Sequence, residues 1–169
     1  MKAVIVHAFT ALFVFCVIYA MITDYSRLRI PNMVSIVLTL AFFPFALIVG
    51  PEAMPLLEHL GLAALIFALL FLCFAFGWMG GGDVKLAGAI MLWVGPSQGM
   101  NFVLLFAVLG GALGLGLWSL RLAMVQYPQI ETVPGMAKFS GWARNGICPY
   151  ALPIGAAGLI VAPALFARV

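Results

Sequence analysis

Long apolar runs, separated by short polar or glycine-rich breaks, make up nearly the whole chain. The runs predict helices over residues 3–22, 33–49, 56–76, 84–94, 101–120 and 150–166. Most of them approach the ~20 residues that a helix needs to cross the hydrocarbon core of a bilayer. The pattern therefore predicts an all-α polytopic membrane protein, a six-transmembrane-helix bundle forming one membrane-embedded domain over residues 1–169.

The run over residues 84–94 is shorter than the others and ends at Gly95-Pro96. At 1.5 Å per residue it covers only ~17 Å of a ~30 Å hydrocarbon core. Two arrangements remain open. Either the helix extends back through Gly80–Gly82, or its start at Asp83 lies below the membrane surface in a hydrated recess. Irregular backbone at that depth is tolerated only where protein or water satisfies it.

Composition and charge narrow the function classes. With 66% hydrophobic and 8% charged residues, the chain lacks the polar surface of a soluble globular domain, so we expect it to lie in a lipid bilayer. Its eight Lys and Arg residues are scattered, which argues against a nucleic-acid partner. The three cysteines have no metal-type spacing, and the sequence predicts neither a metal site nor another cofactor.

The basic residues indicate how the helices are oriented. With six crossings, the connections after the first, third and fifth helices share one side. That side holds six of the eight basic residues, most of them near the helix ends or in the polar connection over residues 121–149, whereas the other side holds Lys2 and Arg168. The positive-inside rule makes the first side cytoplasmic, so 121–149 is expected to be a cytoplasmic loop and both termini are expected outside the cytoplasm.

Asp24 and Asp83 are the only two aspartates, and both fall on the predicted cytoplasmic face. An ionisable residue near hydrocarbon costs roughly 2.5–3.5 kcal/mol, which makes each of them a functional candidate. Taken singly, Asp24 is equally well explained as a hydrated helix stop and Asp83 as the N-cap of the next helix. Their shared face, and the glycines beside Asp83 that permit close backbone approach, favour a joint role.

Two neighbouring carboxyl groups support hydrolysis of an amide by water. The pair titrates as a unit because both groups do not ionise cheaply together. The ionised group takes a proton from water while the protonated group polarises the scissile carbonyl. Neither a metal nor a nucleophilic side chain is needed, and His7 and His59, near the predicted outer face, are interpreted as structural or incidental.

These motifs resemble a known family. Gly80-Gly81-Gly82-Asp83 fits the Gly-x-Gly-Asp signature of intramembrane aspartyl proteases, and Met79–Leu86 is similar to the type IV prepilin peptidases, especially their small Tad/Flp-type members. Asp24 followed by Arg29-Ile30-Pro31-Asn32 resembles the first catalytic segment of that family. The resemblance extends through the Pro149–Pro153 start of the last helix.

The resemblance implies a peptidase of the bacterial cytoplasmic (inner) membrane that removes the short basic leader of type IV or Flp-type prepilins or pseudopilins at the cytoplasmic face. It implies Asp24 and Asp83 as catalytic residues, and as candidates for substrate positioning Gly80, Gly82, Lys85, Arg29, Pro31 and Asn32. Lys85 either tunes the acids electrostatically or extends its ammonium group to the interface, and we favour the second. The chain lacks the cytosolic insert and four-cysteine zinc site of the larger bifunctional members, so N-methyltransferase activity is not expected.

Two other function classes stay open at this point. A small membrane transporter would also use intramembrane acids, and the short helix beside glycines suits a broken helix that lines an ion path. A non-catalytic assembly component of a secretion or pilus machine would keep the fold and need neither acid.

Overall fold

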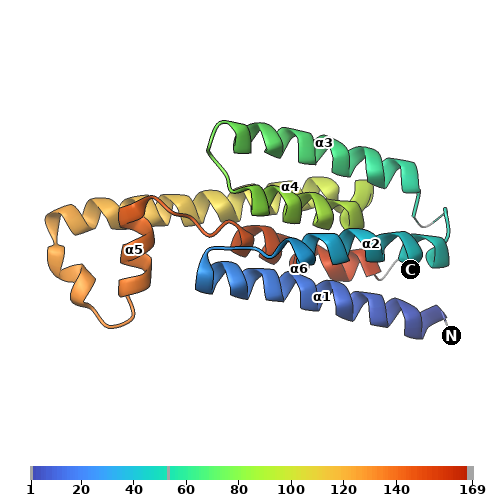
Figure 1. The fold of residues 1–169 in the computed structure, drawn as a ribbon, viewed down its shortest axis with the longest axis horizontal. Helices are drawn as coiled ribbons and strands as arrows, with labels where there is room; N and C mark the ends of the chain where they lie inside the picture. The colour runs from blue at the N-terminus through green and yellow to red at the C-terminus, as the bar shows by residue number, and fades with distance from the viewer. Residues whose placement is uncertain (1, 53, 167–169) are drawn as a thin grey trace.

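A computed structural model describes residues 2–52 and 54–166 and is helical throughout its regular segments (Figure 1). Arg168, one of the two basic residues predicted on the outer side, lies outside the described residues. Four helices are long and apolar enough to cross a membrane, and α6 is a shorter apolar helix, so the prediction of an all-helical membrane protein is confirmed. The elements are α1 (Lys2–Arg27), α2 (Asn32–Val49), α3 (Leu56–Ala75), α4 (Gly81–Gln126), the 3-10 helix η1 (Pro128–Thr132), α5 (Ala137–Asn145) and α6 (Ala151–Phe166).

Helix α4 consists of two antiparallel halves joined at Gly95. This residue has φ 60° and ψ −167°, which lie outside the helical region, and Pro96 follows it. A straight helix would separate Asp83 from Gly110 by ~40 Å. Both nevertheless lie beside Tyr150, since a Cβ at Gly110 would be 3.5 Å from the Tyr150 ring and the charge of Asp83 acts on its hydroxyl. Figure 1 shows the first half running beside α3 and the second half returning past the bundle.

The predicted break at Gly95-Pro96 is therefore found. The helices on either side of it have different limits from those predicted. The first half begins at Gly81 rather than at residue 84, so the helix does extend back through two of the three glycines. The second half continues to Gln126 rather than ending at residue 120. From Gly81 to Val94 the first half still covers only about 21 Å, less than the thickness of the hydrocarbon core.

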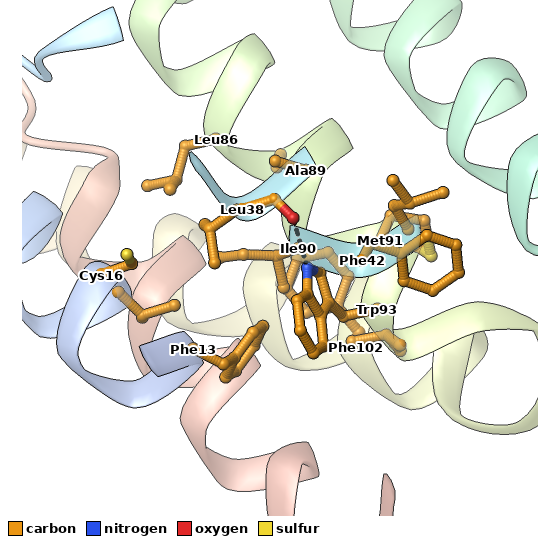
Figure 2. Packing of buried hydrophobic residues seen from close by; sticks show 14 of the residues in the cluster. Phe13, Cys16, Leu38, Phe42, Leu86, Ala89, Ile90, Met91, Trp93 and Phe102 are labelled. Atoms are coloured by element: carbon orange, nitrogen blue, oxygen red, sulfur yellow. Dashed lines mark hydrogen bonds between the residues drawn. The ribbon is translucent and has the colours of Figure 1, made fainter. Parts of the chain in front are cut away.

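The core that holds the halves together centres on Trp93 (Figure 2). Its ring lies 5.0 to 5.9 Å from those of Phe45, Phe13 and Phe42. The indole Nε1–H donates a 2.8 Å hydrogen bond to the carbonyl oxygen of Leu38, which satisfies the one polar atom that this buried side chain brings. Because these contacts join α1, α2 and the first half of α4, they fix the helices that carry both aspartates.

At the end of the bundle that holds the chain termini, His59 closes the turn at Gly95. The buried imidazole Nδ1 lies 2.8 Å from the Leu92 carbonyl oxygen, and the ring stacks on Phe42 at 5.5 Å. A Cβ at Gly95 would overlap the imidazole, so the close approach and the positive φ both require glycine. His59 thus has the structural role expected for it.

The segment over residues 121–149, predicted as a polar loop, is largely helical. The end of α4, η1 and α5 form a small second core that includes Leu117, Met124 and Trp142. Lys138 lies over the Tyr25 ring, 3.7 Å from its centroid, and Trp142 meets the same ring edge-on. The loop prediction was wrong. It relied on the basic residues of this segment and overlooked an amphipathic helix, whose apolar side packs near the end of α1.

Candidate functional site

Asp24 continues the buried stripe of α1. The buried residues of this helix recur every three or four positions, from Phe13 through Val17 and Ala20 to Asp24. Because α1 extends to Arg27, beyond its predicted end at residue 22, Asp24 lies inside the last turn and is only 6% exposed. The helix stop expected at Asp24 is instead at Leu28, whose φ is 52°.

The N-terminus of α6 holds the Asp24 carboxyl group. The backbone N–H of Ala151 donates a 3.1 Å hydrogen bond to Asp24 Oδ2. The first N–H groups of a helix have no partner within the helix and form a natural anion site. This contact links two segments that are 127 residues apart in the sequence.

Asp83 lies in the first turn of α4, where it is only 8% exposed. Gly80 is the N-cap of this helix, so the interpretation of Asp83 as the N-cap is wrong. The Asp83 carboxyl group turns back toward Gly80, where an added Cβ would lie 2.8 Å from Oδ2. Asp83 Oδ1 is buried and has no hydrogen-bond partner among the residues that the structure describes. A buried polar atom without such a partner is unusual and marks a candidate functional group.

The fold brings the two carboxyl groups into one site. The Asp24 carboxylate repels that of Asp83, and both act on the Cys148 thiol, which lies in the connection between α5 and α6. Burial, together with these two negative charges, raises the pKa of Cys148 to about 11. Burial also raises the pKa of Tyr150, with further contributions from Cys148, Asp83 and Cys73. The site therefore combines residues from α1, α4 and the start of α6.

The glycines before Asp83 give neighbouring elements room at the start of α4. A Cβ at Gly82 would lie 3.2 Å from the Ile30 side chain, and one at Gly81 would lie 3.2 Å from the Phe74 ring. Each of these distances is tighter than an ordinary Cβ contact, so a larger residue would push the start of α4 away from its neighbours. Gly80 and Gly82 thus act on the position of Asp83.

The remaining predicted positioning residues do not converge on the acids. Lys85 points away from Asp83, since two residues turn a helix by about 200°, and its ammonium group donates a 3.0 Å hydrogen bond to Asn32 Oδ1. Pro31 is the N-cap of α2, and Arg29 is exposed just before it. The structure therefore joins Lys85 and Asn32 in a second cluster and leaves Arg29 outside both.

Sequence reasoning missed the residues that complete the acid site. Ala151 acts through its backbone, and no side-chain pattern identifies such a donor. The signal that was present is the expected helix start after Pro149, because a helix start supplies free N–H groups. Cys148 and Tyr150, which flank Pro149, were not singled out because nothing in their spacing connects them with Asp24 or Asp83.

Comparison with known proteins places the chain in a family. Residues 11–115 match the model of the type IV leader peptidase family, over more than half of the chain. The chain belongs to the type IV leader peptidase family. The matched region contains both aspartates and the glycine segment, whereas the Ala151 donor lies beyond it. The family resemblance noted from the motifs is confirmed. No curated protein and no solved structure matches the chain.

The position of the helix break bears on the transporter alternative for this leader peptidase homologue. In that alternative, the discontinuous helix would line the path beside the intramembrane acids. Gly95 instead contacts His59 near the start of α3, at the end of the bundle away from Asp83 (Figure 1). The break serves the reversal of α4 and does not adjoin the acids.

Proposed function

We propose that this protein is an aspartyl endopeptidase that removes the leader peptide of type IV or Flp-type prepilins. The observation that carries the proposal is the convergence of Asp24 and Asp83, from α1 and α4, on one buried site at the start of α6. Membership of a leader peptidase family supports a peptide substrate. A paired, desolvated acid site supports the aspartyl mechanism.

The two carboxyl groups share the proton transfers of hydrolysis. The ionised group takes a proton from water as the water oxygen attacks the carbonyl carbon, and the protonated group donates to the carbonyl oxygen. As the tetrahedral intermediate collapses and the C–N bond breaks, the group that took the water proton donates it to the leaving amine, and the other group takes a proton back from a hydroxyl of the intermediate, which restores the pair. The Ala151 N–H fixes Asp24 Oδ2, while Asp83 Oδ1 has no hydrogen-bond partner in the described part of the chain and is available to the reacting groups.

We infer that the protein is a peptidase without N-methyltransferase activity. The larger family members with both activities carry a four-cysteine zinc site in a cytosolic insert, whereas this chain has three cysteines in all. Two of them, Cys16 and Cys73, lie within α1 and α3, and Cys148 adjoins the acids. Mass spectrometry of the mature pilin separates leader removal from an added methyl group.

We propose that the acid site faces the cytoplasm. Supporting residues are the basic side chains at that end of the bundle, which include Arg27, Arg29 and Lys138. Single cysteines at the exposed positions Ser26 and Ala137 should then react with an impermeant thiol reagent only from the cytoplasmic side, and one at the exposed Ser97 only from outside. Labelling of positions 97 and 137 from the same side would contradict this orientation.

The decisive experiment is cleavage by the purified protein in lipid nanodiscs. The substrate is an Flp-type prepilin with a basic leader before its apolar helix, and the readout is loss of the leader mass. The expected result is a single cut on the leader side of the apolar helix. An intact prepilin, with the protein folded and the leader accessible to an added protease, would favour the non-catalytic assembly role instead.

A further inference from the structure

A groove runs along the first half of α4, on the face opposite Asp83. Helices α2 and α3 both pack on α4 and make little contact with each other, so this half of α4 forms the floor between them (Figure 1). The groove has a volume of about 700 Å³. From Asn32 to Leu40 it follows α2 for ~12 Å, about two helical turns.

The groove walls are apolar and partly made of small residues. Ala63, Ala64, Gly88 and Ala89 keep its floor low, which permits the backbone of another helix to approach closely. A Cβ at Gly88 would lie 3.1 Å from the ring of Phe67, so the glycine also allows that ring to form part of the wall.

Two polar groups in the groove lack suitable partners within the chain. Ser35 is 7% exposed and lines the groove, and its Oγ has no hydrogen-bond partner within residues 2–52 and 54–166. Lys85 lies at the end nearer the acid site, and among the described residues its only partner is the neutral side-chain oxygen of Asn32. A neutral acceptor leaves the positive charge of the ammonium group unbalanced, and two of its three donors free.

We propose that this groove docks the apolar helix of the substrate, with a substrate carboxylate near the end of that helix pairing with Lys85. The proposal rests on the proposed peptidase function and names the surface that selects the substrate. The apolar walls suit a membrane helix. The unbalanced charge of Lys85, at the groove end nearer the acid site, selects an acidic residue on that helix. The unpartnered Ser35 hydroxyl offers a hydrogen bond within the groove. Lys85 is then a positioning residue for substrate.

The groove also leads to the acids by a short path. A substrate chain that leaves the groove at Lys85 must pass around the start of α4 to reach Asp83 on the other face of this helix. One helix width of ~10 Å corresponds to about three extended residues. The path crosses Gly80–Gly82, where Gly80 is exposed and has no side chain to obstruct it. The scissile bond is therefore expected in an unwound segment just before the docked helix.

Photo-crosslinking in nanodiscs tests the location of the substrate. A photoreactive residue replaces Ile36 in the groove or Ile18 on the outer face of α1, two isoleucines of similar exposure at 47% and 41%. In the Asp24→Asn background, which holds the prepilin uncleaved, position 36 should capture prepilin and position 18 should capture lipid. Capture of lipid alone at position 36, or of prepilin equally at both positions, would overturn the proposal.

Filling the groove provides a second test with a matched control. Ala64→Phe places a ring in the groove, whereas Ala11→Phe places one on an exposed part of α1. The first should raise KM for the full prepilin about tenfold or more, and the second should leave it unchanged. Wild-type cleavage with no difference between the two variants would contradict docking while leaving the peptidase function intact. Absence of wild-type cleavage would contradict the peptidase function itself.

Charge exchange tests the pairing with Lys85. Lys85→Met should raise KM about tenfold for a prepilin with an acidic residue at the start of its apolar helix, as expected for a lost charged hydrogen bond. Lys85→Glu should be worse, and a lysine in place of the substrate acid should restore its cleavage. A purely structural Lys85 would give no such rescue, and that result would overturn the pairing.

Discussion

The two ends of the helix bundle treat their buried polar groups differently. At the end with the chain termini, the His59 imidazole meets the Leu92 carbonyl oxygen and stacks on Phe42. At the other end, Asp24 has a backbone donor, but one buried oxygen of the neighbouring Asp83 has no hydrogen-bond partner among the described residues, and the Asp24 carboxylate disfavours ionisation of Asp83. One end closes a turn with its polar group satisfied, and the other holds together two acids that do not both ionise cheaply.

Under the proposed function, this difference separates the groups that maintain the fold from the groups that perform the chemistry. Unsatisfied and repelling groups cost stability, and a fold retains them where activity depends on them. Substitutions at the acid end should therefore affect catalysis while leaving stability unchanged or improved. Substitutions at the His59 end should reduce stability without changing the chemistry of the molecules that remain folded.

The largest expected effect is the loss of cleavage in Asp24→Asn and Asp83→Asn. Each substitution removes a general acid–base group worth roughly 10²- to 10⁴-fold in rate. In Asp24→Asn the side-chain amide oxygen still accepts the Ala151 N–H, so the fold should persist, and the melting temperature of the Asp83 variant should equal or exceed that of wild type. Prepilin cleavage and thermal unfolding, measured on the same samples, check both parts.

The double variant refines this prediction. In the proposed mechanism the two carboxyl groups act as a unit, so removing both should be scarcely worse than removing either one. Multiplicative losses in the double variant would indicate two independent roles. Substantial cleavage by either single variant at normal abundance would rule out the aspartyl pair.

The next largest effect is expected for Gly95→Ala at the opposite end. The positive φ and the overlap of the new Cβ with His59 together should cost roughly 2 to 5 kcal/mol of unfolding free energy. Gly111→Ala is the matched control, because its Cβ would meet no atom within 4 Å. Thermal unfolding in detergent measures the difference, and equal melting temperatures for the two variants would contradict the role of Gly95.

The smallest effect concerns the Cys148 thiol. Its pKa of about 11 keeps it protonated at neutral pH, and the charges of Asp83 and Asp24 contribute to that value. Neutralising either acid should lower the pKa and increase the thiolate fraction, with about a threefold faster alkylation for each half unit. The assay uses a variant with Cys148 as the sole cysteine, and Glu52→Gln, an exposed change on the α2–α3 connection, should leave the rate unaltered.

The sequence was most informative about features that depend on one helix alone. Apolar runs predicted the main helices, and Gly95-Pro96 predicted the break in α4. Local signals left the answer open where packing decides, as at Gly81 and Gly82, which are helical despite their poor helix propensity and pack closely on Phe74 and Ile30.

The two aspartates were identified because charge is rare in this chain, but the third component of their site was not. The Ala151 donor is a backbone group, and it reaches Asp24 only through the packing of α6 on α1 and α4. The groove between α2 and α3 was missed for a similar reason. The groove exists because α2 and α3 make little contact with each other, and no pattern along a single helix predicts that.

The Ala151 contact has a consequence for biosynthesis. A chain emerging from the ribosome presents both aspartates long before the residue that holds Asp24, since Ala151 belongs to the last helix to enter the membrane. Under the proposed function, the nascent protein therefore carries its acids without the completed site, and proteolytic competence is deferred until α6 has been inserted. A chain truncated after residue 149 should insert and yet leave prepilin uncut, which would make α6 the timing element of the protease.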